Sequence, residues 1–277
     1  MTARPTPPST LSGALRVFDL SIGEMLWSRR TIFMALVVGS PVLLALVARL
    51  VQAAGIAPLR VNGVQVDAAG MFGMMIWVLF IRFIVPVLGV FYGTALIADE
   101  VEDRTITYLF TRPIRRGAVL LGKYLAYLAC TTLVVLPAVV LVYLLIVPFG
   151  QVGGSFGWLL VDLGLLALGL AAYGALFALV GAVMRRPLVS GLVFAFGWEQ
   201  IALLVPGYLR HFTVAYHVQS LVPHAAPSDS VISLVQTALF ETPPPAAVSL
   251  FWLVAGTAVF LVLAARAVER REYVLQQ

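Results

Sequence analysis

Long apolar runs alternate with short polar segments along almost the whole chain. Six runs reach the roughly 20 residues that a helix needs to cross a bilayer core of about 30 Å. They cover residues 32–54, 71–98, 118–147, 157–184, 187–207 and 246–267. The pattern predicts an all-α fold: a polytopic membrane protein with six transmembrane helices in one domain over residues 31–268.

The composition supports a lipid-facing surface. Of the 277 residues, 61% are apolar and 11% are charged, whereas soluble domains are about half apolar and about a quarter charged. The absence of an internal repeat gives no support to the inverted-repeat design of many secondary transporters.

The segment before the first run has the periodicity of a surface helix. Its apolar residues recur at spacings of three and four: Leu11, Leu15, Phe18, Ile22 and Met25. Residues 11–30 are therefore expected to form an amphipathic interfacial helix after a disordered tail, residues 1–10. Such a face also suits packing on another protein, but Trp27 beside Arg29 and Arg30 favours the lipid bilayer.

The basic residues predict the orientation. The net charge is +5, but the basic residues flank the apolar runs, which favours a topological role over nucleic-acid binding. With both termini inside, fourteen of the 18 Lys and Arg residues lie on the cytoplasmic side. Both termini, including the tail at 269–277, are therefore expected in the cytoplasm.

The longest segment assigned to the outside covers residues 208–245. It contains a short apolar helix face: Val231, Leu234, Val235, Leu239 and Phe240. This face is too short to cross a bilayer, so we expect a re-entrant or interfacial helix before the last span. The external segment is also a candidate contact for an external accessory protein.

The polar segment between the second and third runs holds the most distinctive motif. An acidic cluster, residues 99–103, opens a predicted short helix over 100–112, which Pro113 ends. The helix carries an apolar ridge with Tyr108 and Leu109, which suits docking into a groove on a soluble partner. A solvated loop with orienting arginines is the alternative.

The order of residues in this segment resembles the signature of ABC-2 type permeases, the membrane subunits of a class of ATP-binding cassette exporters. The matching positions are Gly93, Glu100 or Glu102, Arg104, Thr105, Pro113, Arg115, Gly122 and Lys123. A second pattern, at Gly191, Leu192, Trp198 and Glu199, is similar to the NosY-like branch.

The resemblance implies a function and partners. Residues 100–112 would be the coupling helix that touches a separate nucleotide-binding subunit. The residues expected to carry the coupling are Glu100, Glu102, Arg104, Thr105, Arg112, Pro113 and Arg115. The resemblance also implies two cassette ATPase chains, which bind ATP and Mg²⁺, and a second permease chain in a homodimer or heterodimer in the bacterial inner membrane. This chain would have no catalytic residue and no cofactor of its own.

One motif imitates a nucleotide site. Residues 117–123 match the first seven positions of a P-loop, but Tyr124 stands where a Ser or Thr should bind Mg²⁺, and no strand precedes the glycine. We expect a helix entering the membrane there.

Three ionisable residues lie inside apolar runs: Arg82, Asp162 and Glu199. Such groups are strongly unfavourable in lipid unless they are paired or hydrated. Glu199 is the preferred partner of Arg82, and Asp162 is the alternative. The pair would either fix helix register or line a pathway.

Other candidate residues give weaker indications of function. Gly89 and Gly93 form a face of small residues that suits either packing within the chain or a dimer seam. The spacing of His211, His217 and His224 does not favour a metal site, and the single Cys130 is expected to be a small buried residue.

Three classes of function fit these features. The leading one is the permease of an ATP-driven exporter. A second is a membrane anchor that transmits force to an external partner without moving solute. A third, a proton-driven carrier, would be active without an ATPase. The cargo is open.

Overall fold

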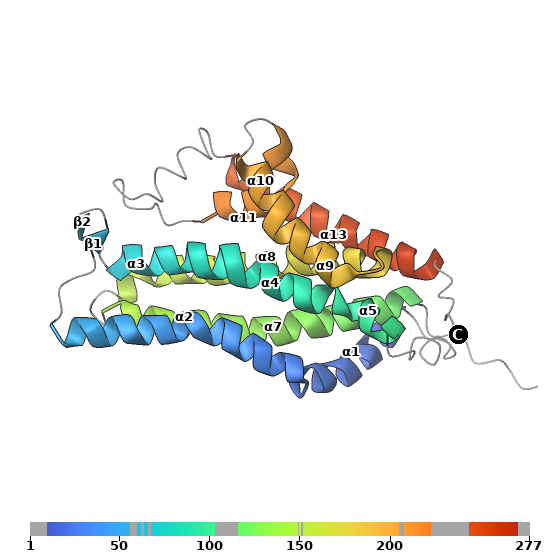
Figure 1. Ribbon diagram of the computed structural model, residues 1–277, viewed down its shortest axis with the longest axis horizontal. Coiled ribbons are helices and arrows are strands. Elements are labelled where there is room, and N and C mark those ends of the chain that lie inside the picture. Colours follow the sequence, from blue (N-terminus) through green and yellow to red (C-terminus); the bar gives the residue numbers. More distant parts are fainter. Residues whose placement is uncertain are drawn as a thin grey trace, which may run out of the picture.

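The computed structural model describes residues 10–55, 60–61, 64–65, 68–102, 116–148, 150, 152–204, 208–222 and 244–270. The described residues form an elongated bundle whose long helices run along its long axis (Figure 1). Among the described residues, five helices are long and apolar enough to span a membrane: 30–53, 68–98, 117–146, 152–183 and 246–270. The multi-pass all-α prediction is confirmed.

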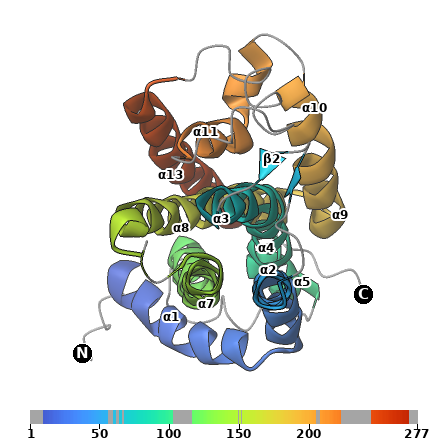
Figure 2. The ribbon, with the colours of Figure 1, turned by 90° about the vertical axis from the view of Figure 1, so that its left-hand side faces the viewer.

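The N-terminal segment forms two helices joined by a corner. Helix α1 covers Thr10–Leu26 and helix α2 covers Arg29–Ala53. At the corner, the hydroxyl groups of Ser28 and Thr31 both donate hydrogen bonds to the Met25 carbonyl oxygen. Helix α1 lies across helix α7 at one end of the bundle (Figure 2).

A two-stranded antiparallel ladder follows, with β1 at Arg60–Val61 and β2 at Val64–Gln65. The second span then runs as one rod through five segments: α3 (Ala68–Met75), η1 (Ile76–Ile84), α4 (Val85–Leu88), η2 (Gly89–Gly93) and α5 (Ala95–Glu102). Segments η1 and η2 are π-helical. π-Helical turns are rare and occur often at functional sites.

The third and fourth spans form the centre of the bundle. Helix α7 covers Arg116–Ile146 and helix α8 covers Val152–Val183. The Tyr143 hydroxyl lies 3.0 Å from the Val152 carbonyl oxygen, to which it can donate at the turn between the two helices. The second and fourth spans are the most enclosed, since 61% of the residues in the most apolar stretch of each are buried.

The fifth apolar run forms three consecutive helical segments. They are α9 (Pro187–Leu192), π-helical η4 (Val193–Trp198) and α10 (Glu199–Leu204). Its apolar helix, Pro187–Leu203, is shorter than the five spans. Residues 205–207 of the predicted span over 187–207 lie outside the described residues. Pro206 and Gly207 follow in the sequence, and both residues disfavour helix.

The chain then turns back toward the bundle. A 3₁₀ turn, η5 (Tyr208–Phe212), leads into helix α11 (Val214–Ser220), and helix α13 (Ala246–Arg270) completes the described chain. Helix α11 packs against α13, α8 and η1, and its residues 215–219 are buried.

The segment 208–245, predicted to be one external loop, begins with η5 and the packed helix α11. A Cβ atom added to Gly169, the middle of α8, would lie 3.3 Å from Val85 Cγ1 and 3.8 Å from Val218 Cγ1. Helix α11 therefore lies level with the middle of the second and fourth spans. A segment that does not span the membrane can lie at this depth when the surrounding protein shields its backbone from lipid. The predicted re-entrant helix around residues 231–240 lies outside the described residues.

Glycines bring the second and fourth spans into close contact. A Cβ atom on Gly93 would lie 2.9 Å from Phe177 Cβ, and one on Gly181 would lie 2.4 Å from the Thr94 carbonyl oxygen. On Gly89 it would lie 2.8 Å from Tyr173 Cβ. The sequence left open whether Gly89 and Gly93 serve packing within the chain or a dimer seam. In the structure, both residues serve packing within the chain.

The predicted cytoplasmic segments meet at one end of the bundle. Helix α5, the start of α7 and the end of α13 lie together there, opposite the β1–β2 ladder (Figure 1). Helix α1 reaches the same end, where a Cβ atom on Gly122 would lie 2.5 Å from the Ala14 carbonyl oxygen. The arrangement agrees with an even number of membrane crossings between the polar segment after α5 and the C-terminus.

Candidate functional site

The centre of the second span carries a cation. Arg82 is the fifteenth of the 31 residues of this span, on η1. Its Nη2 atom donates to Gln200 Oε1 at 2.6 Å, and its guanidinium carbon lies 5.5 Å from the centroid of the Trp77 ring. Arg82 thus connects the second span to α10 through one neutral acceptor, Gln200, while the Trp77 ring of its own segment η1 lies against the guanidinium.

The adjacent carboxylate makes different contacts. Glu199, the first residue of α10, is only 1% exposed. It accepts hydrogen bonds from the Tyr173 hydroxyl of α8 and from the Val214 amide at 3.2 Å. Val214 begins α11, so the carboxylate also faces the positive end of that short helix. Glu199 therefore joins α8, α10 and α11.

The expected ion pair between Arg82 and Glu199 is not what the structure shows. Arg82 reaches the right helix but bonds to Gln200, the next residue, and no ion pair joins it to a carboxylate in the described part of the chain. The alternative partner, Asp162, is buried eleven residues before Tyr173 on α8, about 16 Å along the helix.

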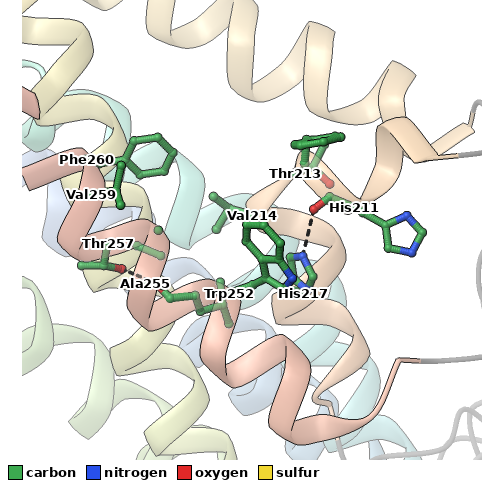
Figure 3. A pocket seen from close by; sticks show the side chains of 13 residues that line it. His211, Thr213, Val214, His217, Trp252, Ala255, Thr257, Val259 and Phe260 are labelled. Atoms are coloured by element: carbon green, nitrogen blue, oxygen red, sulfur yellow. Dashed lines mark hydrogen bonds between the residues drawn. The ribbon is translucent and has the colours of Figure 1, made fainter.

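An apolar cavity of about 240 Å³ lies beside these contacts, between α13 and the η5–α11 segment (Figure 3). Trp252 and Phe260 line it from α13, and His211 and His217 line it from the other side. The His217 Nε2 atom lies 2.9 Å from the His211 carbonyl oxygen. Since a carbonyl oxygen only accepts, Nε2 carries the hydrogen and donates it.

The histidines have structural contacts. The other ring nitrogen of His217 lies 3.3 Å from the Ser249 hydroxyl of α13, so His217 helps to hold α11 against α13. The His211 ring packs at a tilt against that of Tyr216, with ring centroids 4.8 Å apart. No group of three His, Cys, Asp or Glu residues that could hold a metal occurs among the described residues. His224 lies outside them.

The predicted coupling residues fall at the edge of the described chain. Glu100 and Glu102 lie in the last turns of α5, and the structure does not describe their side chains. Arg104, Thr105, Arg112, Pro113 and Arg115 lie outside the described residues, as does most of the predicted helix 100–112.

The segment that imitates a P-loop is helical, as predicted. Residues 117–124 belong to α7. Gly122 lies against α1, and the Tyr124 hydroxyl donates to the Ala171 carbonyl oxygen at 2.9 Å. A phosphate-binding loop needs exposed amides, which an α-helix interior lacks.

Three contributors to the site were not predicted. Tyr173 and Gln200 were missed because neither is ionised near neutral pH, so neither stands out in an apolar run. Helix α11 was missed because Thr213, His217 and Gln219 give it the polar composition of an external loop. The usable signal was the capping residue Thr213, whose hydroxyl accepts from the Tyr216 amide.

Comparison with models of protein families identifies the family of this chain. The family model described as "ABC-2 family transporter protein" matches residues 24–273. The matched range starts near the end of α1 and extends past α13, so it includes every predicted span and the polar segment after α5. The match is to the family as a whole and does not distinguish its branches. The comparison with curated proteins finds no match.

Proposed function

The chain belongs to the ABC-2 family of transporter membrane proteins, and from that premise we propose that it is the permease subunit of an exporter driven by a separate cassette ATPase. ABC-2 permeases generally work with a cassette ATPase and a further permease chain. The complex we propose contains two ATPase chains, which bind ATP and Mg²⁺, and two permease chains. It lies in the bacterial inner membrane with both termini of this chain in the cytoplasm.

The observation that carries the proposal is the anchoring of the coupling segment. Thr94 immediately precedes α5, and its carbonyl oxygen lies so close to Gly181 that no side chain fits between the second and fourth spans. Residues 100–116 begin six residues later. A force applied to them is transmitted directly to α8, because closely packed helices move together rather than compress.

The contacts farther along the second span extend this path. Arg82 bonds to Gln200 on α10, and Glu199 on the same helix holds α8 and α11. Movement of the second span therefore reaches α10 and α11 without a flexible link. We propose that closure of the ATPase dimer on ATP pushes residues 100–116, tilts the second and fourth spans and opens a path at the permease interface.

The residues proposed to receive the force come from the motif. Glu100, Glu102, Arg104, Arg112 and Arg115 would pair with charges of the ATPase, and Thr105 and Pro113 would shape the turn. The two acidic residues followed by three arginines suit electrostatic complementarity with one partner surface.

The test uses Arg104→Glu, a charge reversal in the proposed contact. Arg270→Glu, at the exposed end of α13 on the same side of the bundle, is the matched control. We expect Arg104→Glu to weaken association with the cassette ATPase by roughly tenfold or more, because a close charge pair becomes a repulsion. The control should bind like the wild type. An ATPase that never associates with the wild-type chain contradicts the proposal.

Transport in sealed vesicles separates this function from its rivals. A permease moves solute when the ATPase and ATP are present. A subunit that only transmits force to an external partner hydrolyses ATP through its partner without moving solute, and a proton-driven carrier works without the ATPase.

A further inference from the structure

Arg82 lies where a lipid headgroup does not reach. It is at the midpoint of a 31-residue span, about 20 Å along the helix from either end. The hydrocarbon core is about 30 Å thick, and long basic side chains extend to the interface only from positions near helix ends. The charge of Arg82 must therefore be compensated within the membrane.

The described residues compensate the charge of Arg82 incompletely. Gln200 and Trp77, the two groups in contact with the guanidinium, are both neutral. Glu199 precedes Gln200 on α10, but its carboxylate accepts hydrogen bonds from Tyr173 and Val214. An arginine has five N–H donors, and the described residues accept one of them. Within the described part of the chain, a positive charge with four further donors is left at the centre of the span.

The residues beside Arg82 show which face this is. Arg82 is half-buried, while Val78 and Phe83 on the same segment are 37% and 48% exposed. The Phe83 ring lies 6.1 Å from that of Phe196 on η4, which is also exposed. Arg82 thus lies on the surface where the second span meets η4 and α10. Lipid tails against this surface would leave the cation without solvation, which is strongly unfavourable.

We propose that Arg82, held in place by Gln200 and Trp77, is an anion-binding site on the translocation path, and that the transported solute carries an anionic group such as a carboxylate, sulfonate or phosphate. The bond to Gln200 fixes one edge of the guanidinium and leaves the other edge for bidentate contact with an oxyanion. Phe83 and Phe196 beside it suit an apolar part of the same solute. The inference rests on the proposed function, since it names the solute class of a chain that moves solute.

The test measures whether the surface beside Arg82 is hydrated and attracts anions. Cys130, the single cysteine, is replaced by Ala, and Val78→Cys is introduced one turn from Arg82. The protein in lipid vesicles is treated with methanethiosulfonate reagents that carry either a sulfonate or a trimethylammonium group. Both rates are normalised to those of a free thiol in solution.

The expected result is a preference for the sulfonate reagent of roughly tenfold, because a unit positive charge lies within about 8 Å of the thiol in a medium of low effective dielectric. Arg82→Gln should remove the preference, and Arg82→Lys, which keeps the charge, should retain it. The control is Leu43→Cys at an exposed position on α2, where both reagents should react slowly and without preference.

Any one of three results overturns the proposal. If Val78→Cys reacts no faster than Leu43→Cys, the surface is not hydrated. If Arg82→Gln leaves the preference unchanged, or if no preference exists because a carboxylate of a second permease chain neutralises Arg82, the site is not an anion site. The measurement needs neither ATPase nor solute, so failure of the proposed function leaves its outcome unchanged.

Discussion

Replacing Glu199 should detach α11 from the bundle, because this one carboxylate serves two donors that have no alternative acceptor among their described contacts. In Glu199→Ala, the Tyr173 hydroxyl and the Val214 amide both lose their acceptor. Each buried donor left without an acceptor costs about 1–3 kcal/mol, so the variant should lose about 2–6 kcal/mol of unfolding free energy. That range is a large part of the stability of a typical protein.

The size of the loss should follow the number of hydrogen bonds removed. Glu199→Gln keeps one carbonyl oxygen, so it satisfies one donor and should lose about 1–3 kcal/mol. Tyr173→Phe removes one donor and leaves the contact with Val214. In a cycle with Glu199→Ala, the double variant should lose less than the sum of the two single variants, because both changes remove the same hydrogen bond.

The assay is reversible unfolding in mixed micelles followed by tryptophan fluorescence, together with hydrogen exchange of the α11 amides. Glu269→Ala, at an exposed position near the end of α13, is the control and should change stability by less than about 0.5 kcal/mol. The reasoning is refuted if Glu199→Ala is no less stable than Glu269→Ala and the α11 amides keep their protection.

Two further predictions concern contacts between spans. A double-variant cycle between Arg82→Met and Gln200→Leu should give a coupling energy of about 1.5–3 kcal/mol, as for a hydrogen bond to a charged group. Gly181→Ala should destabilise the protein by about 1–3 kcal/mol, because the added methyl group would lie 2.4 Å from the Thr94 carbonyl oxygen. Gly164→Ala on the same helix has open space around it and should be neutral or stabilising by up to about 1 kcal/mol. Unfolding in mixed micelles measures all of these; a coupling energy near zero, or equal effects at the two glycines, would contradict the contacts described above.

The sequence predicted the spans well because lipid imposes a simple rule on them. A spanning helix must be apolar along about 20 residues, and five of the six predicted runs meet that rule in the structure. The fifth run is described from Pro187 to Leu204, and its apolar helix is shorter than the five spans. Pro206 and Gly207, which follow in the sequence, both disfavour helix.

Helix α11 shows where apolar composition no longer predicts which segments are buried. Its polar residues suggest exposure to water, yet they are satisfied inside the protein: Thr213 caps the helix, and His217 bonds to Ser249 and to the His211 carbonyl oxygen. These partners come from α13 and η5. Composition alone cannot reveal a polar segment whose hydrogen bonds are made by distant elements.

The partner of Arg82 was wrong by one residue because only ionisable residues were considered, and helix geometry then decides between neighbours. Successive residues on an α-helix point about 100° apart, so the choice between Glu199 and Gln200 depends on helix register. Residues 193–198 of η4 are π-helical, and this wider turn shifts the register of α10 relative to a regular helix. Periodicity read from the sequence assumes the regular helix.

The central claim is that residues 100–116 face the cytosol and receive force from a cassette ATPase. The most direct measurement places a single cysteine there, Leu109→Cys in a Cys130→Ala background, and labels it with a membrane-impermeant maleimide. The account predicts labelling in inside-out vesicles and not in right-side-out vesicles, with protection when the ATPase is bound. Labelling only from the outer side, or labelling that the ATPase never slows, would contradict it.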